Sequence, residues 1–152
     1  MAGMGDEVAR RAAASNALEH EFGVIIRRIR RTTATRAHMV HPGLPAASYS
    51  MLTALRDSGP HRSSDLAEIF AIDKGAVSRQ IARLDRLGLV ERLPDPDDGR
   101  AQRVALTAAG AERLKKVDLA RRVWYAERLA DWSADDIAEL AALLARYNSA
   151  LD

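Results

Sequence analysis

The sequence changes from helical to strand periodicity within one continuous run, DKGAVSRQIARLDRLGLVERLPDPDDGRAQRVALT (residues 73–107). Asp73 is a suitable N-cap and Gly88 a suitable residue to end a helix, so we predict a helix over residues 74–87. One face of this helix is apolar, with Val77, Ile81 and Leu84 at helical spacing. The opposite face is polar and mostly basic, with Lys74, Ser78, Arg79, Arg83 and Arg86.

A β-hairpin is predicted directly after this helix. Residues 89–93 and 103–106 are short strand candidates because the helical spacing of apolar residues ends there. The intervening residues 94–102 read PDPDDGRAQ and are turn-forming types, which predicts a hairpin with a long tip.

Two shorter helices are predicted before this run. The first covers residues 46–58, and the second starts near Ser63 or Ser64, either of which could cap it. A three-residue connection, residues 71–73, joins the second to the helix over residues 74–87. Two short helices joined by a tight turn form a helix-turn-helix, and the following hairpin makes it winged.

Longer helices are predicted on both sides. Residues 16–39 carry apolar side chains at helical spacing, and Thr107 begins a helix that extends to about Asp131. Ser133, with Asp136 three residues later, forms a capping box for a last helix. We therefore predict a mainly α fold with a small antiparallel β-hairpin wing, that is, a winged helix-turn-helix with long terminal dimerisation helices.

The predicted organisation has three parts: an N-terminal dimerisation arm (1–45), a DNA-binding lobe (46–107) and C-terminal dimerisation helices (108–152). The terminal helices carry more apolar side chains than one small lobe can cover. Trp124, Tyr125 and Trp132 need burial, either against a partner helix or within the chain's own core. These features predict a homodimer.

The basic helix and the wing are typical of a protein that binds double-stranded DNA. The N-terminal turns of a recognition helix reach base edges in the major groove, where Arg can bond guanine and Gln adenine. The predicted DNA-binding residues are Lys74, Gly75, Ser78, Arg79, Gln80 and Arg83 on the helix, with Arg100 and Arg103 in the wing. A polar, solvated face of a helical bundle is the alternative interpretation.

The acids of the wing require a separate explanation, because carboxylates repel DNA. We predict that Asp98 pairs with an arginine and braces the tip, while Asp95 and Asp97 serve as turn residues.

These residues resemble the MarR family of winged-helix transcription regulators over nearly the whole chain. The resemblance is carried by four motifs: SDLA (64–67), DKGAVSRQI (73–81), LGLVER (87–92), and the wing DPDDGRA (95–101) continuing into VALTAAG (104–110). It implies an obligate homodimer, formed by the first and the last two helices, that binds a pseudo-palindromic operator, usually to repress. It also implies that Asp98 braces the wing and that Arg100 enters the minor groove. Gly75 departs from the family pattern, in which many members have Ser or Thr.

The resemblance also implies release from DNA by a small aromatic or anionic effector bound between the dimer helices and the DNA-binding lobe. The candidate effector-binding residues are Phe22, Ile26, His38, Met39, Tyr49 and Met51. Apolar residues at helical spacing more often belong to the core than to a pocket. We predict no cofactor and no metal site, since the four histidines lack a firm carboxylate partner.

Composition excludes several classes of protein. Cysteine is absent, which excludes disulfide frameworks, zinc fingers and thiolate catalysis. We found no phosphate loop, nucleophile elbow or membrane helix, so we expect a cytoplasmic protein that is not an enzyme. Because the formal net charge is only +2, a winged-helix module that binds proteins rather than DNA is the alternative function.

Overall fold

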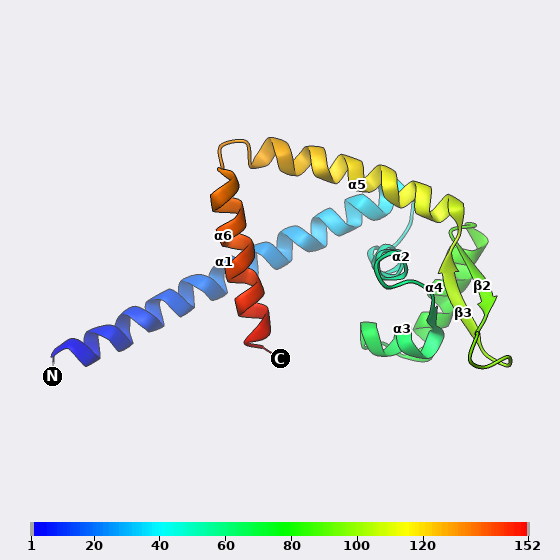
Figure 1. Ribbon diagram of the computed structural model, residues 1–152, viewed down its shortest axis with the longest axis horizontal. Helices are drawn as coiled ribbons and strands as arrows, with labels where there is room; N and C mark the ends of the chain where they lie inside the picture. Colours follow the sequence, from blue (N-terminus) through cyan, green and yellow to red (C-terminus); the bar gives the residue numbers. More distant parts are fainter. Residues whose placement is uncertain (1, 152) are drawn as a thin grey trace. The chain divides into compact units, whose positions relative to one another are not determined.

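The computed structural model describes residues 2–151, with side chains from residue 5 on (Figure 1). The chain divides into one unit up to Leu114 and a second from Lys115 on. The helices are α1 (Ala2–Val40), α2 (Ala46–Ser58), α3 (Ser63–Phe70), α4 (Lys74–Arg86), α5 (Ala108–Arg128) and α6 (Ala134–Ser149). The strands are β1 (His61–Arg62), β2 (Val90–Pro94) and β3 (Gln102–Leu106).

The winged helix-turn-helix predicted from the sequence is confirmed. α2 has the predicted bounds, and Asp73 caps α4 by accepting a hydrogen bond from the Ala76 N–H at 2.8 Å. Gly88 follows α4 with φ of +66°, a left-handed conformation in which glycine is not strained. The predicted caps Thr107 and Ser133 also accept hydrogen bonds from the first turns of α5 and α6.

The sheet has three antiparallel strands in the order β1-β3-β2. β2 and β3 form the hairpin, in which Val90 pairs with Leu106 and Leu93 with Arg103. β1 lies on the other side of β3 and pairs Arg62 with Arg103. The wing is therefore joined by main-chain pairing to the segment that leads into α3.

A small apolar core holds this lobe together. Its fully buried side chains include residues of the short helices, of the α4–β2 connection and of the hairpin: Met51, Leu52, Leu66, Val77, Ile81, Leu84, Leu89 and Val104. The predicted inner face of α4, with Val77, Ile81 and Leu84, is confirmed as the buried face. Burial of this face fixes the rotation of α4 about its axis and thus decides which side chains point outward.

The structure corrects four local predictions. α1 begins at Ala2 and not at residue 16, because its early residues are alanine-rich helix formers without an apolar stripe. α3 is not capped by Ser63 or Ser64; instead the Arg62 N–H donates to Asp65 at 3.1 Å. The sequence does not predict β1, because a strand of only two residues is too short to show an alternation of apolar and polar side chains. α5 ends at Arg128 and not near residue 131.

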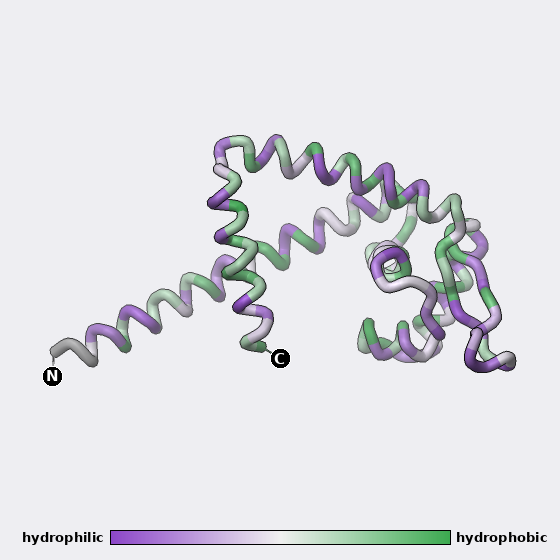
Figure 2. Tube along the Cα trace, viewed as in Figure 1, coloured by the Kyte–Doolittle hydropathy of each residue, from purple (hydrophilic) through white to green (hydrophobic). Residues whose placement is uncertain are grey.

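Apolar side chains also lie exposed along the terminal helices, where Figure 2 shows hydrophobic and hydrophilic residues interleaved. On α1 they include Leu18, Ile25, Ile26 and Ile29, and on α6 they are Ile137, Leu140, Leu143 and Leu144. α6 has no buried residue at all. None of the helices in the described part of the chain is both long and apolar enough to span a membrane.

Candidate nucleic-acid interface

The N-terminal end of α4 presents a compact polar surface. Lys74, Ser78 and Arg79 are exposed there, opposite the buried face of the helix. Gly75 keeps this end of the helix open, because a Cβ at this position would lie 2.9 Å from Asp73 Oδ1 and 3.3 Å from an Arg79 guanidinium nitrogen. The glycine that departs from the family pattern therefore leaves room both for the cap and for Arg79.

Two other residues of α4 that we predict to bind DNA, Gln80 and Arg83, lie outside this exposed N-terminal surface. Gln80 is half-buried and its Oε1 is enclosed without a hydrogen-bond partner, so this oxygen is not presented beside Arg79. A bond from Gln80 to an adenine stays a prediction. Arg83 is exposed but lies nine residues beyond Lys74, which corresponds to about 13 Å along the helix axis.

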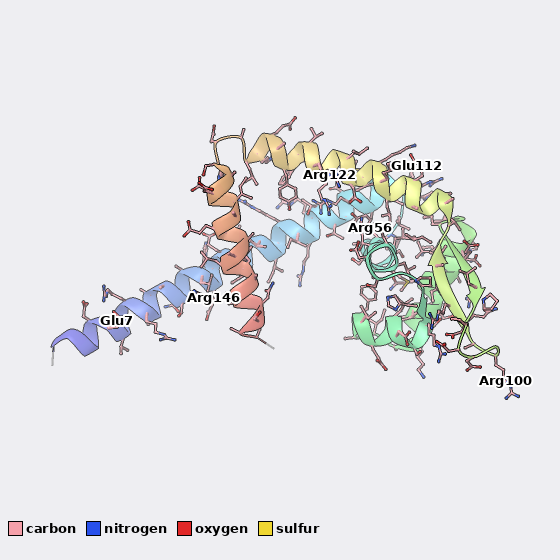
Figure 3. All side chains as sticks on the ribbon, viewed as in Figure 1. Glu7, Arg56, Arg100, Glu112, Arg122 and Arg146 are labelled. Atoms are coloured by element: carbon pink, nitrogen blue, oxygen red, sulfur yellow. The ribbon has the colours of Figure 1, made fainter. Side chains whose placement is uncertain are left out.

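The wing carries Arg100 at its exposed tip, where its side chain points away from the rest of the lobe (Figure 3). The backbone beneath it is ordered by Asp98. The Asp98 carboxylate accepts a hydrogen bond from the Arg100 N–H at 3.0 Å, and its carbonyl accepts one from the Ala101 N–H at 2.9 Å. Asp98 thus shapes the turn that presents Arg100.

The acid that braces the wing is Asp95, whose side chain is buried. Its Oδ2 accepts hydrogen bonds from Arg62 Nε at 2.5 Å and from Arg103 Nε at 3.0 Å. Its Oδ1 accepts one from the Asp97 N–H at 2.9 Å. These bonds, led by that from Arg62, hold the pKa of Asp95 well below its ordinary value, because they stabilise the ionised carboxylate.

This arrangement corrects the prediction for the wing acids. Asp95 was predicted to be a simple turn residue, yet it joins three segments of chain. Asp97 pairs with Arg103 at 3.0 Å, whereas Asp98 forms no ion pair among the side chains that the structure describes. Asp95 and not Asp98 binds both arginines because Asp95 directly follows β2 and faces Arg62 of β1 and Arg103 of β3. Arg103, predicted to contact DNA, is held within this network.

A polar hollow of about 590 Å³ lies between the wing and the start of α3. The residues that line it include Arg62, Ser63, Ser64, Arg92, Arg100 and Gln102. Such a surface, with several arginines and hydroxyl groups, suits phosphate oxygens. Ser63 and Ser64, which the sequence did not indicate as DNA contacts, are therefore candidates for phosphate contacts beside Arg92.

Comparison with known proteins identifies the family. A family model described as MarR family matches residues 43–101. The HTH-type transcriptional regulator YxaD of Bacillus subtilis is 33% identical over 133 residues, covering 88% of this chain and 92% of YxaD. The multiple antibiotic resistance protein MarR of Escherichia coli is 32% identical over 102 residues, covering 66% of this chain and 71% of MarR.

This chain belongs to the MarR family. A mutant of E. coli MarR, solved in complex with operator DNA, has the same fold with a TM-score of 0.59 and 28% identity, covering 84% of this chain and 93% of that protein. The resemblance drawn from the four sequence motifs is thereby confirmed, as is the winged helix-turn-helix fold class. MarR proteins are transcriptional regulators, and this chain shares that general function.

The candidate effector-binding residues of this MarR-family chain differ in their burial. Tyr49 and Met51 are buried in the core of the lobe, whereas Ile26, His38 and Met39 are exposed on α1. Phe22 is half-buried on the same helix. Among the described residues, no group of three or more His, Asp or Glu side chains could hold a metal ion.

Proposed function

We propose that this chain binds double-stranded DNA sequence-specifically as a homodimer and represses transcription from a pseudo-palindromic operator. The observation that carries the proposal is the outward face of α4 combined with a wing that Asp95 braces. Lys74, Ser78 and Arg79 lie at the helix end that enters a major groove, and Asp95 fixes the hairpin that presents Arg100. A bound dimer would repress by covering promoter DNA. We assign Arg83, which is exposed, to the DNA backbone and Arg103 to the wing.

Arg79→Ala is expected to remove one base contact. An arginine that bonds both acceptors of a guanine contributes about 1–3 kcal/mol to discrimination at that base pair. Fluorescence anisotropy with DNA from the chain's own promoter region and with scrambled DNA measures this discrimination. Arg11→Ala is the control, since Arg11 is exposed on α1, 29 residues before its end. If the parent binds both DNAs equally and weakly, specific operator binding is ruled out for this region, and selection from random DNA decides whether another operator exists.

Arg100→Ala is expected to weaken binding to specific and scrambled DNA more evenly than Arg79→Ala does. If Arg100 contacts phosphates at the minor groove, its loss lowers the slope of log K against log salt concentration by about one per lost contact. The same anisotropy titrations at several salt concentrations provide this slope. An unchanged slope together with unchanged affinity would contradict a role of the wing tip in DNA binding.

The homodimer is proposed from the exposed apolar side chains of the terminal helices. Ile137, Leu140 and Leu144 follow helical spacing on α6, and exposed apolar stripes of this kind usually mark an interface. A second copy offers the same stripes, as a two-fold interface requires. Sedimentation is expected to give the mass of a dimer for the parent and a shift toward the monomer for Leu140→Glu. A parent that sediments as a monomer at operator-binding concentrations would overturn the dimer.

A further inference from the structure

The charged residues beside the exposed apolar stripes of α1 and α6 follow the same pattern on both helices. On α1, Glu21 is followed seven residues later by Arg28, and on α6, Glu139 is followed seven residues later by Arg146. Seven residues are two helical turns, or about 10.5 Å, so the acid and the base of each helix lie on one face. All four side chains are exposed, and none of them forms an ion pair among residues 5–151.

This charge pattern favours an antiparallel contact between α1 and α6. An antiparallel contact brings Glu139 to the end of Arg28 and Arg146 to the end of Glu21, so two pairs of opposite charge can form. A parallel contact would place the acids of both helices at one end and the bases at the other, where like charges repel. The order of charges therefore selects the direction of the contact.

The apolar stripes have spacings that fit this antiparallel contact. On α1 the stripe reads, in reverse chain order, Ile29, Ile26 and Phe22. On α6 it reads, in chain order, Ile137, Leu140 and Leu144. Both series step by three residues and then by four, so each side chain of one helix meets one of the other, as in a coiled-coil seam. The α1 stripe also contains Ile25, which makes a parallel register equally possible, so the charges and not the spacing decide the direction.

The apolar register and the charge register agree with each other. When Ile26 lies opposite Leu140, antiparallel counting brings Arg28 level with residue 138 and Glu21 level with residue 145. Each is then one residue, about 1.5 Å along the axis, from its partner of opposite charge. On a helical wheel, the charged residues of both helices lie on the same flank of the stripes, the flank that an antiparallel contact brings together. One register therefore satisfies both the apolar and the charged side chains.

We propose that α6 of a second copy packs antiparallel on residues 22–29 of α1, and that the pairs Arg28–Glu139 and Glu21–Arg146 across this contact decide which chain is accepted as a partner. A two-fold dimer forms the contact twice, because each copy offers both surfaces. Charge pairs beside an apolar seam contribute little to affinity but discriminate between partners, since a chain with a like charge at that place is repelled. This inference rests on the homodimer of the proposed function and not on DNA binding.

The first test reverses one charge on each helix. Arg28→Glu and Glu139→Arg are each expected to weaken the homodimer about tenfold in sedimentation, because both contacts of the dimer then join like charges. An equimolar mixture of the two variants is expected to regain the affinity of the parent, since both contacts between unlike copies again join opposite charges. Native mass spectrometry is expected to find about nine-tenths heterodimer instead of the half that random pairing gives, as a tenfold penalty on each homodimer requires. Arg11→Glu, which also reverses an exposed arginine of α1, is the matched control and should dimerise like the parent.

The second test measures the register with single cysteines, because the chain contains none of its own. Under oxidation, a mixture of Ile29→Cys and Ile137→Cys chains is expected to form a disulfide between copies. A mixture of Ile29→Cys and Leu144→Cys chains is not, since residue 144 lies about 10.5 Å further along α6 and a disulfide cannot bridge Cα atoms more than about 7 Å apart. A parallel contact would give the opposite result.

Random pairing of the two charge-reversed variants would overturn the proposal even if the parent is a dimer, as would a disulfide that forms preferentially between Ile29→Cys and Leu144→Cys. A parent that sediments as a monomer would overturn the homodimer itself, and this contact with it. The two failures are thus distinguishable. Neither test contains DNA, so failure of operator binding leaves both of them decisive.

Discussion

Replacing Gly110 with alanine is expected to lower the free energy of unfolding by about 1–3 kcal/mol, the usual cost of forcing a methyl group into a packed site. A Cβ at this position would lie 2.2 Å from the carbonyl oxygen of Leu89 and 3.1 Å from its carbonyl carbon. Both are backbone atoms, so no side-chain rotation relieves the clash. The gain in helix propensity from glycine to alanine, about 1 kcal/mol, is too small to offset a displacement of the backbone.

The clash matters because the start of α5 is fastened to the segment that follows α4. Thr107 Oγ1 donates to the Gly88 carbonyl at 2.7 Å, and the Thr107 N–H donates to Leu89 at 3.2 Å. Displacing this contact should therefore also disturb the recognition helix and reduce operator affinity. Urea denaturation of the variant and the parent measures the first effect, and anisotropy measures the second.

Gly5→Ala is the matched control for this substitution. Gly5 also lies in a helix, but a Cβ there meets no atom within 4 Å. Its replacement should leave the denaturation midpoint unchanged or raise it slightly through propensity alone. Were Gly110→Ala as stable as Gly5→Ala, the close packing of α5 against Leu89 would be wrong.

Replacing Asp95 with asparagine is expected to loosen the wing and to reduce operator affinity at least as much as Arg100→Ala does. Asparagine keeps the shape of the side chain and can still accept from the Asp97 N–H. It removes the negative charge that Arg62 and Arg103 share, which leaves two guanidinium groups facing each other across β1 and β3. Thermal melts at neutral pH are expected to show a clear fall in the melting temperature.

The loss of stability in Asp95→Asn is expected to become smaller as the pH falls. The pKa of Asp95 in the folded chain lies below its ordinary value of 3.8, so the native state favours the ionised form. The resulting stabilisation is complete above the ordinary pKa and is lost as pH falls toward the lower folded pKa. The difference in stability between the parent and Asp95→Asn is therefore expected to be full at pH 6 and to shrink below about pH 4.

Asp98→Asn separates the two acids of the wing. Asp98 accepts the Arg100 N–H, a bond that an asparagine oxygen can equally accept, so this variant should remain close to the parent in stability at every pH. If Asp98→Asn is the more damaging substitution, the assignment of the bracing role to Asp95 fails.

Most of the helices and the hairpin of this protein could be predicted from local features of the sequence. The apolar spacing of Val77, Ile81 and Leu84 predicted the buried face of α4, and the caps at Asp73, Thr107 and Ser133 predicted where helices begin. These features depend on residues within about one helical turn, so they can be read along the chain. The motifs around them also identified the MarR family.

Which polar side chains bond to one another could not be predicted, because it depends on how the elements pack. Asp95 and Asp98 are three residues apart and of the same type, yet of the two only Asp95 accepts a hydrogen bond from Arg62, which is 33 positions away. The contact of Gly110 with Leu89 likewise joins segments that are distant in sequence. Such contacts depend on how the elements pack, and sequence periodicity reports which face of an element is buried but not which element covers it.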